Sequence, residues 1–73
     1  MNTLNSLSYG DKAVVKRVEA SGSIGRRFLD IGLIENTLVE CVCVSPAGDP
    51  KAFLIRGAVI AIRNKDSSTI VVG

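Results

Sequence analysis

The spacing of apolar residues along this chain predicts which segments form strands and which segment forms a helix. The first patterned run, Lys12 to Val18, follows a predicted turn at Gly10 and Asp11 and is rich in valine, which predicts a strand. Its predicted inward positions are Ala13, Val15 and Val18. The step from Val15 to Val18 breaks the alternation and indicates a bulge or bend near Arg17.

A helical spacing follows in the segment IGRRFLDI. Ile24, Phe28 and Ile31 recur at the spacing of one helical stripe, so they are predicted to face the core. Ser23 is the predicted N-cap, and Gly32 the predicted left-handed residue after the last turn. The segment is too short to be stable unless it packs on a sheet. The polar side chains predicted to face away from the stripe are Arg26, Arg27 and Asp30.

The second half of the chain consists of short apolar runs separated by polar punctuation, which predicts four further strands. These predicted strands are Thr37 to Val44, Ala52 to Arg56, Ala58 to Arg63, and Thr69 to Val72. Ser45 to Pro50 has the composition of a loop, so residues 37–56 are predicted to form an antiparallel hairpin. Asn64 to Ser68 is predicted to be a polar turn, and residues 1–6 an irregular lead-in.

Five short strands with one short helix between the first and the second predict a mostly β fold. The favoured architecture is a small SH3-like barrel, with an OB-like barrel as the alternative, in a single domain over residues 1–73. Composition agrees, because hydrophobic residues make up 47% of the chain and the most numerous of them are Val and Ile, which suit strands. Closing the barrel is expected, since an open sheet this apolar would leave an aggregation-prone edge.

The charge distribution argues against a nucleic-acid partner. Nine basic and seven acidic residues give a net charge of +2, and the only basic clusters are the pairs Lys16–Arg17 and Arg26–Arg27. Nucleic-acid binding would require a basic face, with stacking aromatic residues for single strands. No apolar run approaches the ~20 residues that span a bilayer, and no signal peptide is recognisable. A cytoplasmic protein with reduced thiols and no direct membrane insertion is therefore expected.

The chain offers little catalytic chemistry. It has no histidine, its seven carboxylates are scattered, and no glycine pattern matches a phosphate-binding loop. We therefore predict that the protein is not an enzyme and has no cofactor.

Cys41 and Cys43 are the candidate metal ligands in the chain. Residues i and i+2 of a strand share a face, so the two thiols are expected to be neighbours. Two thiolates make half of a tetrahedral site, and only a bridging homodimer would complete it. The favoured interpretation is that both are small buried hydrophobes facing the core, so no metal site is predicted.

The opposite face of the same strand is also apolar, with Leu38, Val42 and Val44. Either the helix or the lead-in covers this face, or it is an exposed patch that marks a protein interface. A homo-oligomer is one consequence of the second alternative.

Four segments in this order resemble the FeoA family: YGDKAVVKRV (9–18), RRFLDIGLIENT (26–37), SPAGDPKAFLIRG (45–57) and AIRNKDSSTIVV (61–72). The resemblance extends from Leu7 to Val72. It implies an SH3-like barrel, a non-enzymatic accessory role in bacterial ferrous iron transport, and no obligatory metal site. It also implies a partner, the FeoB membrane permease with its cytosolic GTP-binding domain.

The resemblance also indicates where contacts with a partner are expected. Arg26 and Arg27 match the family's helix. The positions that match its hairpin loop are Ser45, Pro46, Gly48, Asp49 and Pro50. Asp49 is expected to cap local backbone amides, those of its own loop.

The chain departs from the family pattern at two positions, with Asn36 where Gly is usual and Ser67 where Ala is usual. Asn tolerates the left-handed turn that Gly would form, so this turn is expected to persist. Gly25 is expected to weaken the helix by ~1 kcal/mol relative to Ala.

The alternative function is an SH3-like domain of the kind found in metal-responsive repressors, which binds a peptide or its own chain. Recognition of a Pro-rich peptide would require an aromatic-lined groove. The only aromatic residues are Tyr9, Phe28 and Phe53, and Phe28 is predicted to lie in the core.

Overall fold

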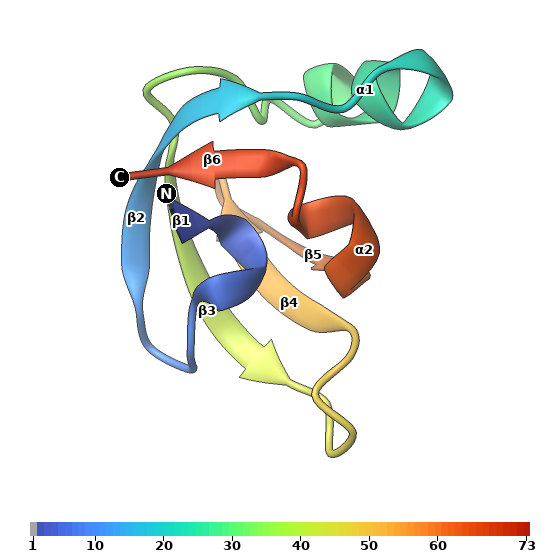
Figure 1. The fold of residues 1–73 in the computed structure, drawn as a ribbon. Helices are drawn as coiled ribbons and strands as arrows, with labels where there is room; N and C mark the ends of the chain where they lie inside the picture. The colour runs from blue at the N-terminus through green and yellow to red at the C-terminus, as the bar shows by residue number, and fades with distance from the viewer. Residues whose placement is uncertain (1) are drawn as a thin grey trace.

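The structure is a computed structural model that describes residues 2–73. Its strands are β1 (Asn2–Thr3), β2 (Lys12–Val18), β3 (Leu38–Val44), β4 (Lys51–Ile55), β5 (Ala58–Ile62) and β6 (Ile70–Val72). They form one antiparallel sheet in the order β1-β6-β2-β3-β4-β5, curved into a small barrel (Figure 1). The helical elements are η1 (Leu4–Ser6), α1 (Gly22–Asp30) and α2 (Asn64–Ser67).

The predicted fold class is confirmed, and the five predicted strands correspond to β2 through β6 with ends that agree to within one residue. The helix α1 lies between the first and second of these strands, as expected. The prediction of an irregular lead-in was wrong for residues 2–6, while residue 1 lies outside the described residues. Strand β1 pairs Asn2 with Val72, so it depends on a partner at the other end of the chain and has no local signature.

The bulge predicted near Arg17 is confirmed. The β2–β6 register shifts between Val15, which faces Val72, and Arg17, which faces Val71. The first half of β2 pairs with β3 and the second half with β6. This bend lets one strand belong to both halves of the barrel.

The core is filled from almost every element. Phe53 of β4 is completely buried, and Phe28 of α1 packs into the same cluster, as predicted. Among the predicted inward positions of β2, Val15 is fully buried, whereas Ala13 and Val18 are half-buried at the margin. The largest fully buried side chains are Phe53, Leu4, Leu33, Ile55, Ile70, Val15, Val39, Cys41 and Ser67.

The segment predicted to be a polar turn, residues 64–68, instead contains the one-turn helix α2. Its Ser67 is completely buried, and the hydroxyl donates a hydrogen bond of 3.3 Å to the carbonyl of Asn64. A small side chain is therefore required here, and serine satisfies its own polar group. Asn36 has φ +72, which confirms the expected left-handed turn before β3.

The expected closure of the barrel is incomplete. Within residues 2–73, β1 pairs only with β6 and β5 pairs only with β4, so the hydrogen-bonded ladder has two edges. None of the helices in this range has the length and hydropathy needed to cross a bilayer.

Candidate partner-binding surface

The start of α1 is set by a close contact with the end of β2. Ser21 precedes the helix as an extended N-cap residue, so the prediction of Ser23 as the cap was wrong by two residues. A Cβ atom at Gly25 would lie 2.7 Å from the carbonyl oxygen of Ala20. Gly25 therefore allows the helix to approach the backbone that follows β2, a requirement that helix propensity alone does not reveal.

The end of α1 is a Schellman motif. Gly32 has φ +84, as predicted for a left-handed residue, and its N–H donates to the Leu29 carbonyl at 3.0 Å. The N–H of Leu33 donates to the Phe28 carbonyl at 2.9 Å. Arg56 Nε donates to the Gly32 carbonyl at 2.9 Å, which ties this exit to the β4–β5 turn.

Arg26 and Arg27 are both exposed, but they border different surfaces. Arg26 lines a wide hollow with Leu29 and the residues that connect β2 to α1. Arg27 lines a small cleft of about 60 Å³ between α1 and β5. The two neighbouring arginines therefore do not contribute to one shared binding site.

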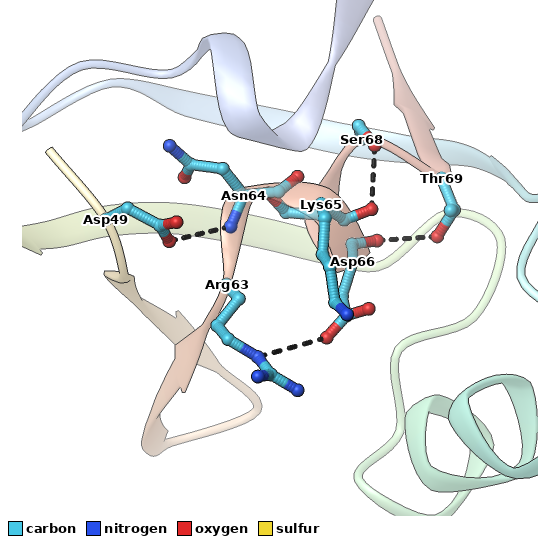
Figure 2. Close-up of polar contacts among 8 residues, drawn as sticks. Asp49, Arg63, Asn64, Lys65, Asp66, Ser68 and Thr69 are labelled. Carbon is cyan, nitrogen blue, oxygen red and sulfur yellow. Dashed lines mark hydrogen bonds and ion pairs between the residues drawn. The ribbon is translucent and has the colours of Figure 1, made fainter.

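The loop between β3 and β4 is held against α2. Asp49 Oδ1 accepts a hydrogen bond of 2.9 Å from the backbone N–H of Asn64, and Asn64 Nδ2 donates to the Gly48 carbonyl at 3.0 Å. Figure 2 shows Asp49 reaching this N–H at the start of α2. The expectation that Asp49 caps amides of its own loop was wrong, because the carboxylate caps a helix 15 residues further along the chain.

Within this loop, Pro46, Asp49 and Pro50 are exposed, whereas Ser45 and Gly48 are half-buried. Gly48 has φ +83 and donates a hydrogen bond of 2.8 Å to the Ser45 carbonyl, which closes the turn. The loop therefore projects from the barrel in a conformation that hydrogen bonds to α2 fix, and its tip is available for contact.

The two predicted contact regions lie at opposite ends of the barrel. Figure 1 shows α1 at the top of the molecule and the β3–β4 loop at the bottom. The structure therefore does not combine Arg26 and Arg27 with residues 45–50 in one site. A partner that contacts both regions would have to extend along the barrel.

The prediction that both cysteines face the core is wrong for Cys43. Cys41 pairs with Phe53, and Cys43 pairs with Ala52, so two steps along β3 match one step along β4. A bulge of this kind turns the following residue to the other face of the sheet. Cys41 is buried and Cys43 is exposed. No group of three or more His, Cys, Asp or Glu residues is clustered for a metal within residues 2–73.

This difference predicts unequal effects of Cys41→Ser and Cys43→Ser. The hydroxyl at position 41 would be buried in an apolar core, at an expected cost of about 1–3 kcal/mol of unfolding free energy. The same exchange at position 43 is expected to change it by less than about 0.5 kcal/mol. Urea denaturation of the reduced proteins measures both values, and equal losses would contradict the assigned faces.

Apolar side chains on the outer faces of β3 and β5 are exposed, and the alternative in which the outer face of β3 is covered is wrong at Leu38. Leu38 is 59% exposed and Val59 is 64% exposed. Val42 of β3 is half-buried. Self-association through the outer face of β3, which includes Leu38 and Val42, stays a prediction.

The strand order, the short helix between β2 and β3 and the small core define an SH3-like barrel domain. The chain belongs to the FeoA domain family, whose model matches residues 2–73. Over 69 residues it is 32% identical to the Fe(2+) transport protein A/Fe(2+) transporter FeoB fusion protein of Porphyromonas gingivalis. That match covers 94% of this chain and 8% of the length of the fusion protein.

Solved structures agree with this assignment. Iron(II) transport protein A from Clostridium thermocellum superposes with a TM-score of 0.92 at 31% identity, covering 97% of this chain and 44% of that one. FeoA from Stenotrophomonas maltophilia, complexed with zinc and described as a procaryotic SH3 domain protein, superposes with a TM-score of 0.89 at 27% identity. The second match covers 100% of this chain and 91% of the other.

Proposed function

We propose that this FeoA domain is a non-enzymatic accessory or regulatory component of bacterial ferrous iron uptake. It acts as a protein-interaction module on the cytosolic side of a FeoB permease that carries a GTP-binding domain. The observation that supports this most strongly is the relative in which a matching segment and a FeoB transporter belong to one chain. Fusion raises the effective concentration of one domain near the other, which favours a weak, repeated contact between them.

The chemistry of the surface supports a binding role. Arg26 and Arg27 are exposed on α1, where guanidinium groups can form bidentate, charge-assisted hydrogen bonds with acidic groups. The tip of the 45–50 loop, with Pro46, Asp49 and Pro50, is the second proposed contact, at the other end of the barrel. The repressor-like alternative would require a DNA-binding domain fused to this one.

A pull-down against the cytosolic domain of the FeoB protein from the same genome tests this function. The wild-type domain is expected to be retained, and the Arg26→Glu/Arg27→Glu variant is expected to lose most of the retention. The matched control is Lys12→Glu/Lys16→Glu, which makes the same change in net charge at two exposed positions of β2. This control is expected to bind like the wild type.

The outcomes separate the possible roles of α1. If the wild-type domain is not retained, docking on the cytosolic domain is excluded. If the α1 variant binds like the wild type, the helix is not a contact region. Equal losses in the α1 variant and the β2 control would indicate general charge attraction instead of a defined surface.

A further inference from the structure

The free edge of β5 offers unpaired backbone groups. Strand β5 follows β4 through the two-residue turn Arg56–Gly57, so Ile55 and Ala58 form the hydrogen-bonded pair that flanks the turn. Hydrogen-bonded and non-hydrogen-bonded pairs alternate in an antiparallel ladder. Val59 and Ala61 therefore direct their N–H and C=O groups away from β4. No backbone hydrogen bond outside the ladders involves either residue within residues 2–73.

This edge lacks the usual protection against pairing with another chain. Proteins commonly guard exposed edges with charged residues, proline or bulges. The sequence of β5 is AVIAI, which contains none of these residue types, and its pairing with β4 has a regular register. An edge of this kind is expected to be covered when the protein performs its function.

A narrow cleft lies beside this edge. Its walls come from α1 and β5, and its volume is about 60 Å³. A cavity of about 150 Å³ accommodates benzene, so this cleft has room for one small aliphatic side chain. The residues that line it are Ile24, Arg27 and Phe28 of α1, Ile31 directly after the helix, Ile60 to Ile62 of β5, and Arg63 and Asp66.

The charges around the cleft favour an acidic partner. Arg27 is exposed and has no ion pair or side-chain hydrogen bond among the described residues. Arg63 forms an ion pair with Asp66 (Figure 2), in which Nε lies 3.8 Å from Oδ2. The Arg63 side chain nevertheless remains 66% exposed. Two guanidinium groups thus face one carboxylate. A second copy of this chain would bring the same excess of positive charge to the contact, which disfavours self-pairing.

We propose that β5 and the cleft bind an extended segment of a partner protein by strand addition. The segment carries a small aliphatic residue that enters the cleft, flanked by acidic residues that contact Arg27 and Arg63. Main-chain hydrogen bonds to Val59 and Ala61 supply the pairing, and the side chains supply the selectivity. This proposal deepens the proposed function and rests on it for the existence of a partner.

Titration with a short synthetic peptide tests the proposal without using any permease. The probe is an N-acetylated, C-amidated peptide of sequence EDVIVDE, added to the ¹⁵N-labelled protein. NMR shifts are expected in β5 and α1, with slower amide exchange at Val59 and Ala61. A control peptide with lysine at every acidic position is expected to bind about fivefold more weakly or worse.

Matched variants separate the backbone contact from the charged contact. Ala61→Pro removes an N–H that faces the open edge and leaves the ladder to β4 intact, so peptide affinity is expected to fall about tenfold or more. Ala61→Ser keeps this N–H and is expected to bind normally. Arg27→Gln is expected to weaken binding several-fold, whereas Lys16→Gln, at an exposed position of β2 that does not line the cleft, is expected to have no effect.

Several outcomes would overturn the proposal. These are absence of binding at millimolar peptide, shifts that map away from β5, or equal binding of the acidic and lysine peptides. Should Ala61→Pro fail to fold, a peptide N-methylated at its central residues provides the same test on the unaltered protein, and undiminished binding would reject strand addition. Sedimentation showing a wild-type dimer lost in Ala61→Pro would identify a second copy as the occupant. The peptide titration contains no permease, so a negative result rejects strand addition at β5 only. Docking on FeoB is tested separately by the pull-down with its cytosolic domain.

Discussion

Replacement of Phe53 by alanine is expected to lower the free energy of unfolding by about 3–5 kcal/mol. Phe53 is completely buried at the centre of β4, between Cys41 of β3 and Ile60 of β5 in the ladder. A truncation there leaves a cavity that the surrounding strands can fill only partly. A domain of this size has total stability of only several kcal/mol, so the variant is expected to be largely unfolded at moderate denaturant concentration.

The control for this prediction is Leu38→Ala, which removes a large apolar side chain from the exposed outer face. Its expected effect is below about 0.5 kcal/mol, because the side chain is already mostly in water. Urea denaturation followed by far-UV circular dichroism measures both variants. A loss below about 1 kcal/mol for Phe53→Ala would show that the core can close around the missing ring.

Replacement of Gly25 by alanine is expected to destabilise the protein by about 1–3 kcal/mol, although alanine is the better helix former. Helix propensity alone predicts a gain of about 1 kcal/mol for this change. The added Cβ would lie 2.7 Å from the Ala20 carbonyl oxygen, which is backbone and cannot rotate away. Relief requires α1 to move relative to β2.

Ser23→Ala is the matched control, because Ser23 is an exposed residue of the same helix. It is expected to leave stability unchanged or to raise it slightly, as propensity predicts. Thermal unfolding of the three proteins distinguishes the two effects by sign. If Gly25→Ala is more stable than the wild type, the close approach of α1 to Ala20 is not a structural requirement.

Most of the secondary structure was predictable because its signals are local. The inward positions Ala13 and Val15 predict β2, and the longer step to Val18 predicts the bulge near Arg17. The helical spacing of Ile24, Phe28 and Ile31 predicts the buried face of α1, and Gly32 predicts its end. Each signal depends on residues no more than a few positions apart, so it can be recognised without knowing how distant segments pack.

Features that depend on distant partners were not predictable in the same way. Strand β1 exists because Val71 and Val72 of β6 pair with it. The turn of Cys43 away from the core depends on the β3–β4 register, since periodicity in β3 alone places it with Cys41. Asp49 caps an amide of α2 because the barrel brings the two segments together.

The strands, the helix and the mostly β class follow from local sequence patterns, since hydrophobic period and turn residues act over a few positions. The sequence also indicates the FeoA family, through four segments that occur in a characteristic order along the chain. The arrangement of these elements into a surface depends on the tertiary structure. In the folded protein, Arg26 borders the wide hollow and Arg27 borders the small cleft. Residues 45–50 lie at the opposite end of the barrel from both. The same fold makes β5 an edge strand of the sheet, next to the cleft that Arg27 lines, because strand pairing is set by contacts between distant segments.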